Sequence, residues 1–390
     1  MAAAHWLHLY QKPAQGTSFL KRYQAFNYRH KISAVGGFDT AACELSVSRA
    51  EAEQFLEQYV GNRIAAYVDN PAAPIWEGLI NRITFNYGSV EYTISLEEMA
   101  NRATVFMPAQ GTLTTAITAA ANNTASQAIY GIIEKTLDAP PIGSSATGIR
   151  TILRDKYLSQ YAYPQASMAF RGAGAITLRL EMLGFYHTLL WDNYTNTAIT
   201  TANASVVLTE VIQDNANTTT FFDDTDTSLI AANATFTFSR QASTGVTRWQ
   251  FCQGIQEAGD GVNEWIMGIT PTDVNTGKRR FYYQQANNTV EYTAKLAEGL
   301  AVIRSLTGAR VHPWDARPDR AIRVQDALIG WNFPGSDPRQ IFIDTVDYDA
   351  ERQLASFAGQ DDIQLEGALK FKRQYKKRGK RWDSPARPLG

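Results

Sequence analysis

The chain has 390 residues, of which 44% are hydrophobic and 19% charged, so it can bury more than one core and is globular rather than disordered. A formal net charge of −1 excludes a global field that would attract nucleic acid or a membrane surface. The two cysteines, Cys43 and Cys252, predict buried small hydrophobes and not a disulfide framework. The first residues lack the pattern of a signal peptide, and no apolar run of about 18 residues predicts a spanning helix.

The first hundred residues predict a β-rich module. Residues 30–48 alternate as a strand, and Ser48 with Glu51 forms a capping box that opens a short helix ending at Gly61. Three further strands follow, at residues 64–68, 75–87 and 90–96. Their apolar residues alternate with polar ones, which predicts an antiparallel meander with one apolar face. A second short helix is expected at residues 97–102.

Residues 112–220 change in character, because Ala, Thr and Asn dominate and the apolar spacing becomes helical. We predict a mainly helical middle region. Its candidate helices lie at about 129–137, 149–161, 177–194 and 205–213.

Residues 221–295 predict a small α/β unit. A strand holds Phe236 and Phe238, and a helix lined by Trp249, Cys252 and Ile255 ends at the glycines after residue 258. Strands at 264–269 and 279–284 follow.

The C-terminal part predicts a second β-rich module without a catalytic signature. A helix at 295–307 fits the apolar spacing, although Gly299 and Gly308 weaken it. Two prolines make residues 313–319 an extended segment, and strands are expected at 322–324, 341–348 and 363–371, with a loop at 333–338. The last residues, 370–390, hold nine basic side chains and one acid.

This basic tail has two interpretations. It is either a solvated terminus or a contact for an acidic partner surface or passing nucleic acid, because clustered cations neutralise phosphates. The possible interaction residues are Lys376, Lys377, Arg378, Lys380 and Arg381.

We find no set of residues that predicts catalysis, a cofactor or a metal. His5 and His8 have a metal-compatible spacing but no acidic or cysteine neighbour, so a strand or loop is expected there. His187 is expected to be a core or interface histidine. Asp223, Asp224 and Asp226 form either a hard-cation site or a solvated acidic turn. The carboxylate pairs Glu77 with Glu91 and Asp326 with Asp344 could be imagined as hydrolytic, but nothing selects either of them.

Several segments resemble the tail hub proteins of bacteriophages, the baseplate hub or tail-associated family. The segment Ile75–Ile80 with its returning strand resembles that family's N-terminal barrel. The helix opening at Arg248, the strands at 265–269 and 279–284, and the segment Pro313–Asp319 resemble its downstream modules. The resemblance covers residues 60–100 and 245–350.

The resemblance implies an α+β fold in which two small antiparallel β-barrel-like tube modules flank a helical segment and a small α/β module. The implied divisions are a tube-like barrel domain at 1–111, the helical region at 112–220, the α/β domain at 221–295, a second tube-like barrel at 296–371 and the basic tail at 372–390. No cofactor and no enzymatic activity are implied.

The resemblance also implies a function. The chain would be a structural hub of a tail tip or baseplate, a homotrimer whose two barrels per chain make a pseudo-hexameric ring. That ring would join the tail tube or distal tail protein to tip, spike or fibre proteins and let the genome pass, with the tape-measure protein and transient DNA as further contacts in the lumen. The location would be the distal end of the virion tail, after synthesis in the host cytoplasm.

Two alternatives remain open. A receptor- or carbohydrate-binding tail protein would present exposed aromatic side chains, for instance Trp265, Trp331 or Trp382, as sugar platforms. A cell-wall hydrolase would need a catalytic carboxylate pair.

Overall fold

The computed structural model describes most of the chain up to Asp361. The described residues are 5–68, 74–108, 115–138, 146–172, 176–194, 200–213, 218–240, 246–263, 265–273, 278–286, 290–296, 305–309, 321–326, 340–352 and 354–361.

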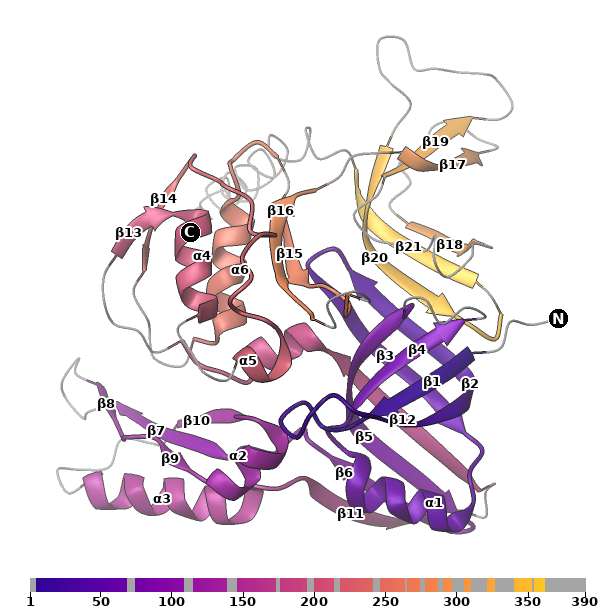
Figure 1. Ribbon diagram of the computed structural model, residues 1–390, viewed down its shortest axis with the longest axis vertical. Coiled ribbons are helices and arrows are strands. Elements are labelled where there is room, and N and C mark those ends of the chain that lie inside the picture. Colours follow the sequence, from indigo (N-terminus) through magenta and orange to yellow (C-terminus); the bar gives the residue numbers. More distant parts are fainter. Residues whose placement is uncertain are drawn as a thin grey trace, which may run out of the picture.

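Six antiparallel strands close into a barrel at the centre of the molecule (Figure 1). The ring runs β3, β12, β5, β4, β1, β2, and β2 pairs back to β3. The strands are β1 His5–Tyr10, β2 Phe19–Ser33, β3 Gly36–Leu45, β4 Arg63–Val68, β5 Trp76–Tyr87 and β12 Thr177–Gly184. Alternate residues such as Leu7 and Leu9 point inward and are fully buried, so they fill the barrel interior.

The helix predicted at residues 177–194 is wrong, because the first of these residues form the strand β12, which closes the barrel. Leu178, Leu180 and Met182 are buried at a spacing of two, with Arg179 and Glu181 on the other face. A 3-10 helix, Phe185–Leu190, follows directly. The barrel therefore needs a strand from beyond residue 111, and the domain boundary placed there stays a prediction.

A glycine pair allows the tight packing where β12 leaves the barrel. Gly184 pairs with Gly78 of β5, and a Cβ on Gly184 would lie 1.6 Å from the carbonyl oxygen of Phe38 in β3. Since no side chain fits in that space, the three strands meet here only through glycine.

The predicted helix after β3 is confirmed. Ser48 and Glu51 form the capping box of α1 (Arg49–Gln54), and a π-helix, Phe55–Tyr59, continues it and buries Phe55 against the barrel core. The helix expected at 97–102 is wrong, because a turn there leads into the strand β7.

A small unit beside the barrel contains β7 and its neighbours. It comprises β7 Arg102–Pro108, β8 Thr115–Ile117, β9 Ala121–Asn122, β10 Glu134–Asp138, α2 Thr124–Tyr130 and α3 Ala146–Tyr161. The helix predicted at 149–161 is confirmed as α3. The helix predicted at 129–137 is mostly wrong, because α2 ends at Tyr130 and β10 begins four residues later.

The helix and the two last strands predicted within residues 221–295 are confirmed, but their core also includes a helix from the region predicted at 112–220, so the predicted domain bounds stay a prediction. The elements of this α/β unit are β13 Thr200–Asn203, α4 Ala204–Gln213, α5 Thr218–Phe221, β14 Thr237–Arg240, α6 Arg248–Ala258, β15 Trp265–Ile269 and β16 Phe281–Gln285. Helices α4 and α6 bury Val207, Leu208 and Cys252 against Met267 and Tyr283. β15 pairs in parallel with the start of β3, which joins this unit to the barrel.

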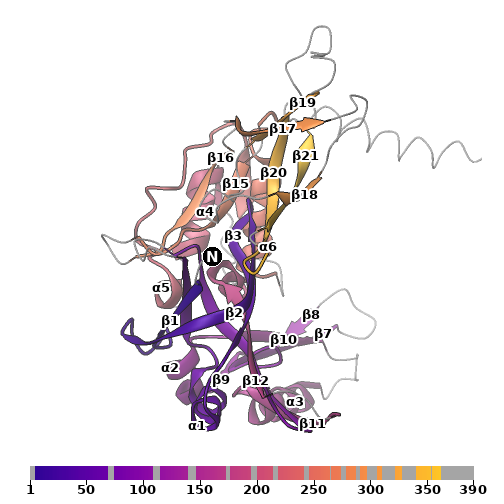
Figure 2. The same ribbon diagram turned by 90° about the vertical axis from the view of Figure 1, so that its right-hand side faces the viewer.

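The second β-module lies at the far end of the long axis (Figures 1 and 2). It contains β17 Val290–Leu296, β18 Ser305–Ala309, β19 Ala321–Asp326, β20 Gln340–Asp349 and β21 Leu354–Asp361. The strands predicted around 322–324 and 341–348 are confirmed. The helix predicted at 295–307 is wrong, since its two ends are the strands β17 and β18. The described strands of this module form an open order, so a second barrel stays a prediction.

Other predicted features fall outside the described residues. These are the segment 313–319, the loop 333–338, the strand 363–371 and the tail 372–390. The described part of the chain is an α+β fold with one closed antiparallel barrel.

Candidate functional site

One continuous antiparallel sheet of nine strands runs through the barrel wall and into the second β-module. Its order is β11, β6, β5, β12, β3, β2, β20, β21, β18, in which β6 is Val90–Ser95 and β11 is Gln165–Phe170. β11 lies at the lower end of the long axis in both views, and β18 lies higher, within the second β-module and below β17 and β19 (Figures 1 and 2). The key junction is the antiparallel pairing of β2 with β20, which joins barrel and second module by main-chain hydrogen bonds.

The outer face of this sheet is mostly hydrophilic, although it also contains Phe26, which lies opposite Glu44 and is 47% exposed. Glu181 of β12 lies opposite Ala42, which pairs with Arg29 of β2, and Arg29 lies opposite Asp349 of β20. Both charge signs alternate across the sheet. We call the following residues the hydrophilic face: Arg29, Lys31, Glu44, Arg82, Thr84, Glu91, Thr93, Arg179, Glu181, Asp347, Asp349 and Ser356.

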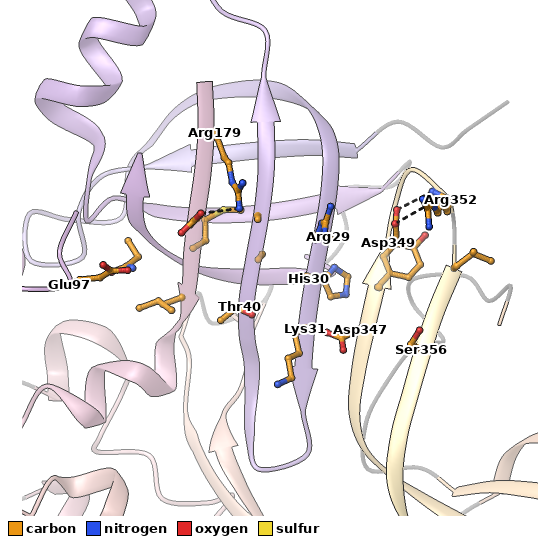
Figure 3. Close-up of a pocket in the computed structure, with 18 residues that line it drawn as sticks. Arg29, His30, Lys31, Thr40, Glu97, Arg179, Asp347, Asp349, Arg352 and Ser356 are labelled. Atoms are coloured by element: carbon orange, nitrogen blue, oxygen red, sulfur yellow. Dashed lines mark hydrogen bonds and ion pairs between the residues drawn. The ribbon is translucent and has the colours of Figure 1, made fainter. Parts of the chain in front are cut away.

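The hydrophilic face is hollowed into a groove of about 620 Å³ where the barrel meets the second module (Figure 3). Arg29 and Lys31 contribute from β2, and Asp347 and Asp349 from β20. Because residues directly opposite on paired strands share a face, the two acids lie in register with the two bases. The groove is therefore charged but nearly balanced in sign.

Charged side chains of the hydrophilic face form ion pairs with neighbouring side chains. Arg179 Nη2 lies 3.0 Å from Glu181, and Lys31 Nζ lies 3.4 Å from Asp39. Burial alone would raise the pKa of Asp39, but hydrogen bonds from His187 and Tyr186 lower it to about 2. Asp39 is thus a stable anion beside Lys31, and such local pairing lowers the net field of the face.

Behind the groove, on the inner face of the same strands, lies a cluster of buried rings. His5 of β1, Tyr28 and His30 of β2, and Tyr348 of β20 are all buried. The ring centroids of His30 and Tyr348 are 5.2 Å apart, and those of His5 and Tyr28 are 5.6 Å apart. Burial, with a smaller effect of His5, lowers the pKa of His30 to about 3, so His30 is neutral at pH 7.

A buried ionic cluster joins the barrel to the α/β unit. Glu77 of β5 is fully buried, with Arg63 Nε at 2.6 Å and Arg279 Nη1 at 2.8 Å from its Oε1. The backbone N–H of Thr272 donates to Oε2 at 2.9 Å. Burial alone would raise the pKa of Glu77, but the charges of Arg279 and Arg63 lower it, so the carboxylate stays ionised. Phe185 lies under Arg279, its ring centroid 3.8 Å from the guanidinium carbon.

The structure assigns the predicted candidate residues mostly to structural roles. His5 points into the barrel and His8 points out, so the two imidazoles lie on opposite faces of β1 and cannot share an ion. His187 is partly buried and its Nε2 lies 3.0 Å from Asp39 of the same chain, so it has a partner within the fold. Glu77 is held by two arginines and is not paired with Glu91.

The carboxylates of the predicted acidic turn pair with cationic side chains. Asp223 accepts a hydrogen bond from Lys278 at 2.6 Å and Asp226 one from Arg280 at 3.2 Å. The bond from Lys278 is the largest of the effects that lower the pKa of Asp223 to about 2. Among the described residues, no group of three or more potential ligands is arranged for a metal ion.

Cys43 and Cys252 are confirmed as buried free thiols. Trp265 is not an exposed platform, because it is only 7% exposed and stacks on Tyr283 at 4.6 Å. Trp331, Trp382 and the five basic tail residues Lys376, Lys377, Arg378, Lys380 and Arg381 lie outside the described residues. Within the described ranges, no helix combines the length and apolar character needed to cross a bilayer.

Sequence reasoning missed the hydrophilic face. Its residues come from strands far apart in the chain, and β2 and β20 are more than 300 positions apart. The alternation in residues 28–32 was a usable signal for the end of β2, because Tyr28, His30 and Ile32 are the inward residues. No local sequence pattern indicated that β2 pairs with β20.

No family model and no curated protein matches the chain. Among solved structures, the chain is similar to the 43 kDa tail protein of prophage MuSo2 from Shewanella oneidensis, with a TM-score of 0.45, 8% identity, and coverage of 93% of this chain and 99% of that one. It is also similar to the E. coli c3393 protein, described as a type VI secretion component with structural similarity to the T4 tail proteins gp27 and gp5. There the TM-score is 0.37 and the identity 7%, over 93% of this chain and 74% of that one. Both descriptions name tail proteins, the class that the sequence resembles, but at TM-scores below 0.5 the likeness does not by itself assign a family.

Proposed function

We propose that the chain is a structural hub protein of a phage tail tip or baseplate. Three copies would form a pseudo-hexameric ring that joins the tail tube to tip or fibre proteins and lets the genome pass. The observation that carries this proposal is the nine-stranded sheet, which connects the barrel to the second β-module and presents one hydrophilic face along both.

A shared sheet suits a ring component because it fixes how the two modules sit beside one another. The β2–β20 junction consists of five paired positions, from Arg29 with Asp349 to Ser33 with Thr345. Its main-chain hydrogen bonds do not depend on one side chain. A trimer of such chains would contain six β-modules held in a fixed arrangement.

The charge pattern of the hydrophilic face suits a passage for DNA. Arg29 and Lys31 lie opposite Asp349 and Asp347, so the face carries both signs and little net charge. A strongly basic wall would bind phosphates and retain the polyanion, whereas a strongly acidic wall would repel it. A balanced wall does neither. This face is therefore proposed to line the lumen.

The basic tail keeps its proposed role as a contact for an acidic partner or passing nucleic acid. Truncation after Phe371 is expected to leave the fold unchanged and to reduce assembly or genome passage. Normal infectivity after truncation would contradict this role.

The proposed function is tested by native mass spectrometry of the purified chain, alone and mixed with the tail-tube and tip proteins of the same virion. A trimer that binds the tube protein is expected. A chain that stays monomeric at micromolar concentration and binds neither protein would overturn the proposal. Binding on a glycan array would favour a receptor-binding protein, and clearing of peptidoglycan in a zymogram would favour a hydrolase.

A further inference from the structure

Aromatic side chains gather on the outer side of the barrel, on the strands β1, β2 and β4. Along β1 the outward residues alternate with residues that fill the barrel interior. Phe19 of β2 lies opposite Tyr10. Tyr67 of β4 lies opposite Trp6, and residues directly opposite on paired strands share one face. We call the following residues the aromatic face: Trp6, His8, Tyr10, Phe19, Arg22 and Tyr67.

The rings of the aromatic face contact one another across the strands. The ring centroid of His8 lies 4.3 Å from that of Tyr67 and 5.4 Å from that of Phe19. The centroids of Tyr10 and Phe19 are 5.8 Å apart. The hydroxyl oxygens of Tyr10 and Tyr67 are 3.4 Å apart. Because the rings hold one another in place, a partner that binds them has little side-chain freedom to remove.

These rings remain accessible although they belong to a barrel wall. Phe19 is 54% exposed, and the other four rings are partly exposed. Arg22 is exposed and stacks on Trp6, with its guanidinium carbon 4.3 Å from the ring centroid. Tryptophan, tyrosine and arginine are the residues that contribute most binding energy in protein interfaces. The composition of the aromatic face is therefore that of a protein-binding surface.

The aromatic face contains a cation and no carboxylate. β1, β4 and residues 19–26 of β2, which form it, contain no Asp or Glu. Within the described part of the chain, Arg22 forms no ion pair, whereas the neighbouring Lys21 pairs with Glu51 of α1. An exposed guanidinium beside a set of rings attracts a carboxylate of a partner.

The neighbouring ionic cluster adds to the positive charge. Arg63 belongs to both surfaces, because its guanidinium carbon lies 4.2 Å from the ring centroid of Tyr10 and its Nε contacts Glu77. With Arg279, the cluster contains two guanidinium groups and one carboxylate, so one positive charge is in excess. The aromatic face is therefore complementary to a surface that combines carboxylates with apolar side chains.

We propose that the aromatic face docks an acidic segment of another tail protein, with its carboxylates at Arg22 and its apolar side chains on the rings. The inference rests on the proposed function, because it takes the partner from the same tail. β1 and β4 contribute no residue to the hydrophilic face, so this partner would sit outside the proposed passage. A sugar fits less well, since guanidinium groups already stack on Trp6 and Tyr10.

The first test measures binding of the purified tail-tube, distal tail and tip proteins of the same virion to the full chain by biolayer interferometry. One of them is expected to bind the wild type. The double variant Phe19→Ala, Arg22→Glu is expected to weaken that binding at least about thirtyfold, because it removes an apolar contact and reverses a charge. The matched control makes the same two changes at exposed positions around the hydrophilic face, Phe26→Ala and Arg352→Glu, and is expected to bind normally. Unchanged circular dichroism in both variants excludes misfolding as the cause.

The second test determines the charge of the partner segment. At about 0.05 M salt, Arg22→Glu is expected to slow association about tenfold, and the difference should shrink at about 0.5 M, where screening is stronger. Arg22→Lys keeps the charge but loses the planar guanidinium that stacks on Trp6, so it should associate like the wild type and dissociate faster. Equal association rates of the wild type and Arg22→Glu at low salt would show that the bound segment is not acidic, and the proposal would be wrong.

Native mass spectrometry separates a wrong docking surface from a wrong function. Phe19→Ala, Arg22→Glu is expected to trimerise like the wild type. Loss of the trimer would make the aromatic face a contact between copies, and equal binding of a tail protein to wild type and variant would place that protein elsewhere. A wild-type trimer that binds none of the three proteins, or that uses this face for a glycan or a single-stranded oligonucleotide instead, has no such partner. Each of these results overturns the docking surface and leaves the proposed function standing. If the wild type forms no trimer and binds none of the three proteins, the proposed function itself fails.

Discussion

The barrel meets the α/β unit and the second β-module through junctions of opposite chemistry. Toward the α/β unit, the contact centres on the buried ionised Glu77 and its two arginines. Toward the second β-module, it combines main-chain pairing of β2 and β20 with the buried rings around His30. A buried charge is costly to leave without its partners, whereas neutral rings are sensitive to protonation. The two junctions should therefore fail under different conditions.

Breaking the ionic cluster between the barrel and the α/β unit should cause the largest loss of folding stability. Glu77→Ala removes the carboxylate and leaves Arg63 and Arg279 buried without their counter-ion. Breaking a buried pair in this way costs about 3–5 kcal/mol of folding free energy. The loss is measured by urea denaturation monitored by tryptophan fluorescence.

The matched control is Glu97→Ala, which removes the carboxylate of a half-exposed pair with Arg82. It should cost at most about 1 kcal/mol. Equal losses in Glu77→Ala and Glu97→Ala would show that the ionic cluster does not hold the junction.

The stability of the junction with the second β-module, which contains the aromatic rings around His30, should fall in acid. The pKa of His30 is about 3 in the folded state, below an unfolded value of about 6.5, so between these values the unfolded state binds more protons. Its contribution to stability is full above pH 6.5 and is lost as the pH falls. At pH 5 the loss, relative to a pH well above 6.5, is about 2 kcal/mol. Denaturant unfolding at each pH measures it.

Among the described residues, the groups that face His30 are not counter-ions that would offset this loss. They are His5 from β1, Tyr28 from β2, Tyr348 from β20 and, beyond Tyr28, Cys43 from β3. Burial raises the pKa of Tyr348 to about 12, and these groups supply no anion near pH 5. His30→Phe should flatten the acid slope while keeping a ring in place. An unchanged slope in His30→Phe would assign the acid response to another group.

Local patterns predicted the elements that a short segment determines by itself. The capping box at Ser48, the strands β4 to β6 and the helix α6 with its glycine end all follow from spacing and cap residues. β12 did not, because Leu180 and Leu183 fit a helical period while Leu178, Leu180 and Met182 fit a strand. Pairing with β3 and β5 decides between the two.

Both junctions were beyond prediction for the same physical reason. Glu77 and Arg279 are about 200 positions apart, and His30 and Tyr348 more than 300. A carboxylate in an otherwise apolar strand segment, as in Ile75–Ile80, was the available signal for a buried ion pair. This pattern identifies the buried carboxylate but not the arginines that pair with it.

Substitutions on the outer face of the junction between β2 and β20 should cause the smallest loss of folding stability. Lys31 lies opposite Asp347 and 3.4 Å from Asp39, so Lys31→Glu places a like charge beside two acids. Cross-strand pairs of this kind are worth roughly 0.2–1 kcal/mol. Because the site is partly exposed, the loss should shrink between about 0.05 M and about 1 M salt, where the screening length becomes short. Lys31→Gln removes the attraction without adding repulsion and should fall between the wild type and Lys31→Glu at low salt. If all three have the same unfolding free energy at low salt, the charges of the groove do not stabilise the junction, and only main-chain pairing and the buried rings hold it.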